Sequence, residues 1–173
     1  LMPTVSLRQQ ACAMASAERE ANGGVFPFRF SAALAESGLS FICEVKKASP
    51  SKGVIAEEFP YLDIAKSYEA AGAAAISCLT EPKWFMGADA YLTEIAAETS
   101  VPVLRKDFVV CERMIYQAKV LGASAVLLIC AILSDDQLVA YRELAESLGL
   151  SVLVEAHDEK EIARAVASGA KIV

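Results

Sequence analysis

The sequence contains no Cys-X-X-Cys pair. Its five cysteines are widely spaced, and three of them, Cys43, Cys78 and Cys130, fall in apolar runs that are typical of strands. Cys12 and Cys111 are equally isolated. The spacing gives no sign of a disulfide framework or a redox motif. We therefore expect reduced cysteines in the core of a protein from a reducing compartment, the cytoplasm.

Long apolar runs and an excess of positive charge are also missing. The longest apolar run, residues 125–133, is far shorter than the roughly 20 residues of a transmembrane helix. The first residues show no basic-then-apolar leader. The net charge is −6, whereas a nucleic-acid-binding protein normally presents a basic face. We expect neither a membrane nor a nucleic acid as a partner.

Two common phosphate-binding loops do not occur. There is no Walker loop, and no GxGxxG segment follows an expected strand. Residues 47–53, Lys-Ala-Ser-Pro-Ser-Lys-Gly, are by themselves ordinary turn chemistry. Phosphate binding by either device is therefore unsupported.

From residue 40 onward, a short apolar run, a polar loop and an Ala/Leu/Glu-rich stretch recur in that order. This alternation is typical of βα units. Several helical stretches end at a glycine, at Gly72, Gly122 and Gly169, and a further helix follows the N-cap candidate Ser134 over residues 135–148. The expected strands are residues 40–46, 73–79, 102–106, 124–132 and 151–156, and another begins at Lys171.

The chain has 173 residues, of which 55% are hydrophobic, enough for one sizeable core. The spacing of the strands extrapolates to the roughly 250 residues of an eight-unit barrel. We therefore expect an α/β fold, an incomplete (β/α)8 TIM barrel over residues 40–173, with about five βα units and the start of a sixth strand. Residues 1–39, with a helix over 5–21, form an N-terminal helical extension. An open doubly wound sheet is the alternative on alternation alone.

Charged residues interrupt three expected strands near their C-terminal ends, where buried parallel strands should be apolar. Glu44 and Lys46 share one face of the first strand. Lys106 lies on the third strand and Glu155 on the fifth. Because alternate strands of such a barrel contribute to one layer, we expect these side chains to meet at the catalytic face. Two carboxylates and two amines suit general acid–base work on a carbonyl compound; for each residue alone, a solvated strand end or a simple ion pair is the alternative.

Two aromatic residues and the single histidine complete the candidates. Phe85 and Phe108 follow the second and third strands, where they would enclose an aromatic ring or pack on the rim. His157 precedes an acidic helix and has no nucleophile or metal ligand beside it in the sequence. We expect it to be a surface residue.

Five segments, in the same order along the chain, resemble the strands and loops of the indole-3-glycerol-phosphate synthase family. The first is Glu-Val-Lys-Lys-Ala-Ser-Pro-Ser-Lys-Gly at residues 44–53, and the third is Leu-Arg-Lys-Asp-Phe at residues 104–108. The others are residues 79–82 with Phe85, residues 126–129 and residues 153–159. The match runs in order from about residue 41 to residue 173.

The resemblance implies a carboxy-lyase of tryptophan biosynthesis that closes the ring of 1-(2-carboxyphenylamino)-1-deoxyribulose 5-phosphate, a phosphorylated anthranilate-ribulose adduct, to indole-3-glycerol phosphate. It implies no metal or organic cofactor. By position, Lys106 would be the general acid at the substrate carbonyl and Glu155 a partner acid or base. Glu44 and Lys46 would assist dehydration, and Lys46 would also meet a substrate anion. The residues implied to bind the substrate are Ser49, Pro50, Phe85, Phe108 and Leu127.

The later motifs of the family, including its glycine-rich phosphate loops, do not occur in these residues. We therefore expect the fragment alone to be inactive and its strand edges to favour aggregation. One alternative is another phosphate-binding barrel enzyme, such as phosphoribosylanthranilate isomerase or the tryptophan synthase α-subunit type. A second is a non-enzymatic partial barrel that needs a partner chain. Fusion or association with other tryptophan-pathway enzymes in the parent protein is left open.

Overall fold

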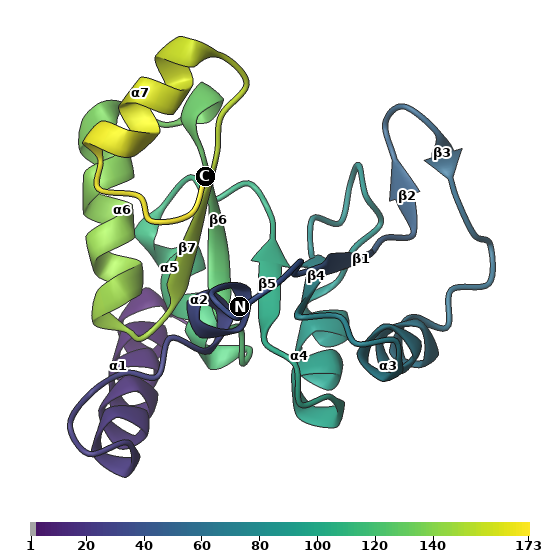
Figure 1. Cartoon of the computed structure of the whole chain (residues 1–173), viewed down its shortest axis with the longest axis horizontal. Helices are drawn as coiled ribbons and strands as arrows, with labels where there is room; N and C mark the ends of the chain where they lie inside the picture. The colour runs from purple at the N-terminus through teal and green to yellow at the C-terminus, as the bar shows by residue number, and fades with distance from the viewer. Residues whose placement is uncertain (1–2) are drawn as a thin grey trace.

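The computed structural model describes residues 3–173. In these residues the strands of one parallel sheet alternate with helices along the chain (Figure 1). The sheet consists of β1 (Ile42–Val45), β4 (Ala75–Leu79), β5 (Val103–Lys106), β6 (Ala125–Ile129) and β7 (Ser151–Glu155). Its spatial order is β1-β4-β5-β6-β7, the order of the chain. All four pairings are parallel, as repeated βα units require. The expected α/β fold with a parallel sheet is confirmed.

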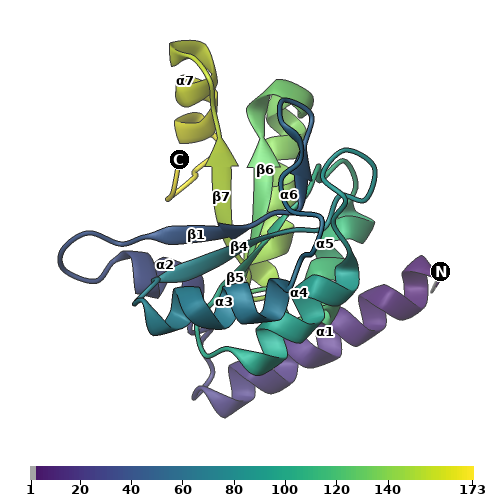
Figure 2. The same ribbon diagram turned by 90° about the vertical axis from the view of Figure 1, so that its right-hand side faces the viewer.

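Helices connect the strands and cover one face of the sheet. They are α3 (Tyr61–Ala70), α4 (Asp89–Glu98), α5 (Glu112–Val120), α6 (Asp135–Ser147) and α7 (Glu159–Ala167). The predicted cap of α6 is present: Ser134 Oγ accepts a hydrogen bond from the backbone N–H of Gln137, whose side chain accepts one from the N–H of Ser134. In Figure 2, β6 and β7 run nearly vertically and β1 runs nearly horizontally. The strand direction therefore turns steadily across the sheet, as it does in twisted parallel sheets.

The two faces of the sheet pack into separate apolar clusters. Side chains of one face, such as Val103 and Val126, join the larger cluster with the helices. On the opposite, inner face, Leu104 and Leu127 pack around the buried ring of Phe30. Phe30 belongs to the short helix α2 (Arg29–Leu34), and Ser31 of this helix donates a 2.8 Å hydrogen bond to Ser151 at the start of β7. Helix α2 therefore covers the inner face at the N-terminal ends of the strands and leaves their C-terminal ends uncovered.

The first helix, α1 (Thr4–Ala21), begins one residue before the predicted helix and ends where that helix was expected to end. Leu7, Ala11 and Ala15 bury its inner side in the larger cluster. Glu18 forms an ion pair with Lys119 of α5. Both α1 and α2 pack into the apolar clusters of the sheet. The division into an N-terminal extension and a partial barrel between residues 39 and 40 remains a prediction.

Two details of the chain trace differ from the expectation. β6 ends at Ile129, and the chain continues as the 3-10 helix η1 (Cys130–Ile132), so the strand expected to reach residue 132 is too long. Arg164 of α7 donates hydrogen bonds to the carbonyls of Cys130 (2.9 Å) and Leu133 (2.6 Å), which hold this turn. Where a plain loop was expected after β1, the antiparallel strands β2 (Ala48–Ser49) and β3 (Gly53–Val54) form a hairpin.

The prediction of five core cysteines is wrong for three of them. All five thiols are free, but only Cys78 and Cys130 are buried. Cys43 is half-buried, and Cys12 and Cys111 are exposed. Cys12 lies on the exposed side of α1, and Cys111 is the N-cap residue of α5. Apolar residues nearby in the sequence therefore do not bury either thiol.

The chain forms the beginning of the further strand that was expected at Lys171. Ile172 pairs in parallel with Leu153, and the N–H of Val154 donates a 3.0 Å hydrogen bond to the carbonyl of Ile172. Ile172 thus lies along the edge of β7 that faces away from β6, and β1 forms the opposite edge of the sheet.

Candidate functional site

A small cavity lies at the C-terminal ends of the strands, the end that α2 leaves uncovered. Its volume is about 100 Å³. The inner faces of β4 to β7 and the loops after β4 and β5 supply its lining: Leu79, Glu81, Phe85, Lys106, Asp107, Phe108, Leu127, Ile129 and Glu155. In parallel α/β folds, ligand sites lie at the C-terminal ends of the strands because the βα loops converge there.

An ion pair between Lys106 and Glu155 forms the polar part of this cavity. Lys106 Nζ lies 2.9 Å from Glu155 Oε2. The two residues end β5 and β7, the strands on either side of β6, so the pair crosses one intervening strand. The side chains are 28% and 32% exposed. A ligand in the cavity can therefore reach both charges, although each charge already has a partner.

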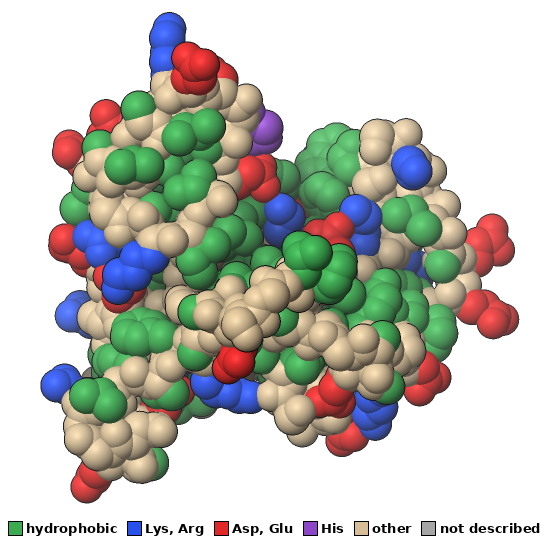
Figure 3. Space-filling model, in the orientation of Figure 1, with side chains coloured by type: hydrophobic (Ala, Val, Ile, Leu, Met, Phe, Trp, Pro, Cys, Tyr) green, Lys and Arg blue, Asp and Glu red, His purple; other side chains and the backbone are tan. Residues whose placement is uncertain are grey.

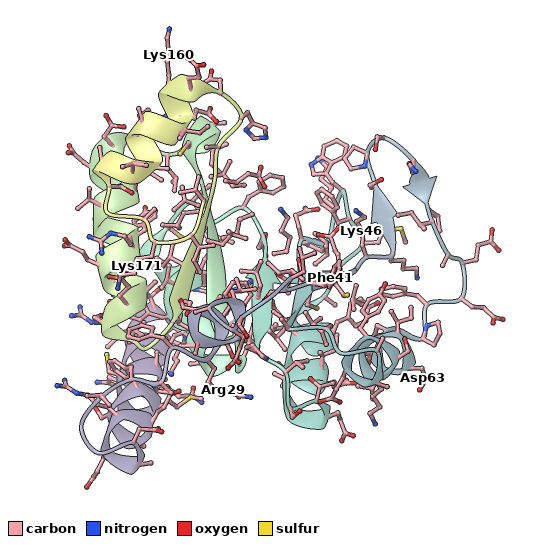
Figure 4. The ribbon with its side chains drawn as sticks, viewed as in Figure 1. Arg29, Phe41, Lys46, Asp63, Lys160 and Lys171 are labelled. Atoms are coloured by element: carbon pink, nitrogen blue, oxygen red, sulfur yellow. The ribbon has the colours of Figure 1, made fainter. Side chains whose placement is uncertain are left out.

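A second ion pair stands at the end of β1. Lys46 Nζ lies 2.6 Å from Glu44 Oε1, and Ser77 of β4 donates a 3.3 Å hydrogen bond to Glu44 Oε2. Figure 4 labels Lys46 at the end of β1, close to the foot of the hairpin. In Figure 3, basic and acidic side chains lie next to one another in the hollow at the centre of the molecule.

The four charged residues that the sequence singled out are thus arranged as two pairs. The strand register aligns Val45 with Cys78 and Leu79 with Lys106, which puts Lys46, Leu79 and Lys106 in one row across the sheet. Glu44 and Lys46 are not part of the cavity lining. Among the ion pairs within residues 3–173, Lys46 pairs with Glu44 and Lys106 pairs with Glu155, and neither lysine pairs with the glutamate of the other.

Aromatic and aliphatic side chains form the apolar part of the cavity. The rings of Phe85 and Phe108 are 6.2 Å apart between centroids and inclined at 50°. Leu127 is buried at the floor. Ser49 and Pro50, which the resemblance assigns to the substrate pocket, do not line the cavity. They belong to the hairpin, which stands to the side of β5, β6 and β7 in Figure 1.

Glu81, which the sequence analysis missed, fixes the loop that carries Phe85. Its carboxylate accepts backbone hydrogen bonds from Lys83 (2.9 Å), Trp84 (2.6 Å) and Phe85 (3.0 Å). Burial raises the pKa of the Glu81 carboxyl, but the three N–H donors and the charge of Lys83 outweigh burial, so this pKa lies below its ordinary value. A glutamate directly before a proline and a turn was the available sequence signal.

A second group that the sequence analysis missed lies behind Lys106, on the outer face of β5. The side chain of Arg105 is 4% exposed, and its guanidinium donates to Thr80 Oγ1 (3.1 Å), Asp89 Oδ1 (3.1 Å) and Asp107 Oδ2 (3.3 Å). A further N–H donates to the carbonyl of Met114 in α5 at 3.1 Å. One guanidinium thus joins the ends of β4 and β5 to the first turns of α4 and α5.

Asp107 links this outer network to the cavity. Its Oδ2 also accepts a 2.6 Å hydrogen bond from Thr80, and its Oδ1 accepts a 2.8 Å bond from the backbone N–H of Phe108. Asp107 therefore fixes the backbone between Lys106 and Phe108, two residues whose side chains line the cavity.

Within residues 3–173, no group of three or more His, Cys, Asp or Glu side chains could hold a metal ion. No helix in that range combines the length and apolar character that crossing a bilayer requires.

The family model described as indole-3-glycerol phosphate synthase matches residues 4–173. The indole-3-glycerol phosphate synthase of Ruminiclostridium cellulolyticum is 57% identical over 147 residues, which cover 85% of this chain and 56% of that protein. That of Lacticaseibacillus casei is 58% identical over 140 residues, 81% of this chain and 54% of that protein. The chain thus spans just over half the length of the curated relatives that it matches.

A solved structure supports the fold. A mandelate oxidase mutant with (S)-mandelic acid superimposes with a TM-score of 0.57 over 94% of this chain and 58% of that chain, at 19% sequence identity. At this identity the likeness concerns the fold alone. The family match and the relatives above 50% identity confirm the resemblance inferred from the strand motifs, and the chain belongs to the indole-3-glycerol phosphate synthase family.

Proposed function

We propose that this chain is the part of an indole-3-glycerol-phosphate synthase that carries its acid–base residues. The reaction is the decarboxylating and dehydrating ring closure of 1-(2-carboxyphenylamino)-1-deoxyribulose 5-phosphate, which makes the enzyme a carboxy-lyase of tryptophan biosynthesis. The observation that carries the proposal is the Lys106–Glu155 ion pair across β6, in a cavity walled by Phe85 and Phe108.

The pair suits the first chemical step. When the ring carbon attacks the substrate carbonyl, negative charge develops on the carbonyl oxygen, which needs a proton. An ammonium group has three N–H donors, so Lys106 can donate one to this oxygen while another stays on Glu155. Glu155 keeps the lysine aimed and is placed to take up or return a proton. Lys106 is thus the proposed general acid.

The second pair suits the later loss of water. The departing hydroxyl needs a proton, and the carbon beside it must lose one. Glu44 and Lys46 provide a carboxylate and an ammonium 2.6 Å apart on the same face of the sheet. Lys46 can also meet an anionic group of the substrate. We assign this pair to dehydration.

The apolar lining suits the anthranilate ring. Phe85 and Phe108 present two inclined aromatic faces, and Leu127 closes the floor between β5 and β7. An aromatic ring placed between such faces gains edge and face contacts. Ser49 and Pro50 do not line the cavity, and their contact with the substrate remains a prediction.

The phosphate site and the closure of the barrel are proposed to lie outside these residues. The chain spans 56% of the Ruminiclostridium cellulolyticum relative. Ile172 begins a strand beside β7, and β1 has a neighbour on one side within the described residues. We propose that further strands complete a (β/α)8 barrel and that the isolated 173-residue chain is inactive.

The test is an assay of the complete protein for indole-3-glycerol phosphate formation, with Lys106→Ala as the variant. Loss of a general acid should lower kcat by at least about 100-fold. The matched control is Lys66→Ala, because Lys66 lies on α3 and pairs with exposed Glu98. Full activity of the Lys106 variant would contradict the assigned role, and absence of activity in the wild-type protein would contradict the proposed reaction.

A further inference from the structure

The imidazole of His157 contacts the carboxylate that pairs with Lys106. His157 Nε2 lies 3.4 Å from Glu155 Oε1, whereas Lys106 Nζ lies 2.9 Å from the other oxygen, Oε2. One carboxylate therefore has a cationic partner on one oxygen and a titratable partner on the other.

The start of α7 holds the imidazole in this place. His157 Nδ1 lies 3.2 Å from Glu161 Oε2, and the same oxygen accepts a 2.8 Å hydrogen bond from the backbone N–H of His157. Asp158, the N-cap of α7, accepts a 2.8 Å hydrogen bond from the backbone N–H of Glu161. The cap thus fixes Glu161, and Glu161 in turn fixes the ring.

Each ring nitrogen of His157 faces one carboxylate. Nδ1 is hydrogen-bonded to Glu161, and Nε2 lies at ion-pair distance from Glu155. The charged groups around the ring are Glu155 from β7 and Glu161 and Asp158 from the start of α7, with Lys106 of β5 reached through Glu155. The ring side chain is 62% exposed.

We propose that His157 is a positioning residue for the Lys106–Glu155 pair. The ring lies against Glu155 Oε1, on the far side of the carboxylate from Lys106, and limits the movement of this carboxylate. Glu155 in turn keeps the Lys106 ammonium aimed into the cavity. The His157–Glu155 coupling does not depend on the proposed function, but its effect on catalysis rests on it.

The first measurement is the NMR spectrum of the His157 ring in the complete protein, with the ring signals identified by their loss in His157→Gln. Because Nε2 lies 3.4 Å from Glu155 and Nδ1 lies 3.2 Å from Glu161, these signals should shift in Glu155→Gln and in Glu161→Gln. Glu159→Gln removes an equal charge from the same turn of α7 and is the matched control. Ring signals that are unchanged in Glu155→Gln would overturn the coupling. If that variant does not fold, the response of Glu161→Gln decides whether the ring is held as described.

The second measurement is the pair kcat and KM of His157→Gln in the complete enzyme. A poorly positioned Lys106–Glu155 pair should lower kcat by about tenfold and leave KM unchanged. An unchanged kcat in the variant would overturn the positioning role. An inactive wild-type protein would overturn the proposed function, and the NMR spectra would still decide the coupling.

Discussion

Arg105→Met tests whether the network behind Lys106 stabilises the fold. Methionine preserves much of the length of the side chain but donates no hydrogen bond. Arg105 has four acceptors, on Thr80, Asp89, Asp107 and Met114. The change removes every one of these bonds and leaves the carboxylate of Asp107 without its cationic partner.

The expected loss follows from the burial of the partners. Removing one member of a buried ion pair costs about 3 to 5 kcal/mol, because the other charge stays buried. The Asp107 side chain is 9% exposed and carries most of this cost, whereas Asp89 is 42% exposed and remains hydrated. Asp107 also keeps the Thr80 hydroxyl and the Phe108 N–H as donors. We therefore expect the lower end, a loss of about 3 kcal/mol in the free energy of unfolding.

Urea unfolding followed by circular dichroism measures this loss. Lys66→Met is the control, because the Lys66–Glu98 pair is 47% and 54% exposed and should contribute less than about 1 kcal/mol. Arg105→Lys keeps the charge but not the forked geometry, so its loss should lie between the two. A loss below about 1 kcal/mol for Arg105→Met would refute the argument that this network stabilises the fold.

Two further predictions concern stability and thiol chemistry. Gly87→Ala should lower the free energy of unfolding by about 3 kcal/mol, because the added Cβ would lie 2.4 Å from the carbonyl oxygen of Leu79. Gly23→Ala should lower it by about 1 kcal/mol, because Gly23 has a φ of 70° but open space around it. Equal losses of stability in thermal melts of the two variants would contradict this prediction. Burial raises the pKa of the Cys78 thiol from 9.0 to about 12, so the thiol should resist iodoacetamide at about pH 8 while exposed Cys111 reacts, as mass spectrometry would show. Because the folded state favours the neutral thiol, the contribution of Cys78 to stability is unchanged below pH 9.0 and declines between pH 9.0 and about 12. Cys78→Ala should remove this decline.

The fold was predictable where periodicity and glycine caps coincide. Glycines with φ near 86° end three helices at Gly72, Gly122 and Gly169, and a strand or bridge follows each one. The end of β6 was not predictable, because the apolar run continues past Ile129 and apolar character alone does not separate a strand from a 3-10 turn. The hydrogen bonds from Arg164 that hold this turn come from a later helix. The hairpin strands, two residues each, are too short to show any period.

The candidate site was predictable to the extent that a charge in a buried strand is conspicuous. Lys106 and Glu155 stood out for this reason, and the structure pairs them at 2.9 Å. Arg105 is equally charged, yet its partners come from separate loops and helices, so the sequence alone did not group them. His157 is exposed, as expected, but its contact with Glu155 depends on how the start of α7 folds back over β7.

The alternation of side chains along β5 explains how one strand can serve both stability and chemistry. Arg105 points to the helices and joins two strands to two helices, while Lys106 points to the inner face and the cavity. A lysine on a flexible stem is a poor acid unless its backbone is fixed, because each misplaced position weakens the contact with the reacting oxygen. The buried guanidinium fixes that backbone without entering the cavity. Substitutions at Arg105 should therefore act on catalysis through the position of Lys106, and those at Lys106 should act on catalysis with little effect on the outer core.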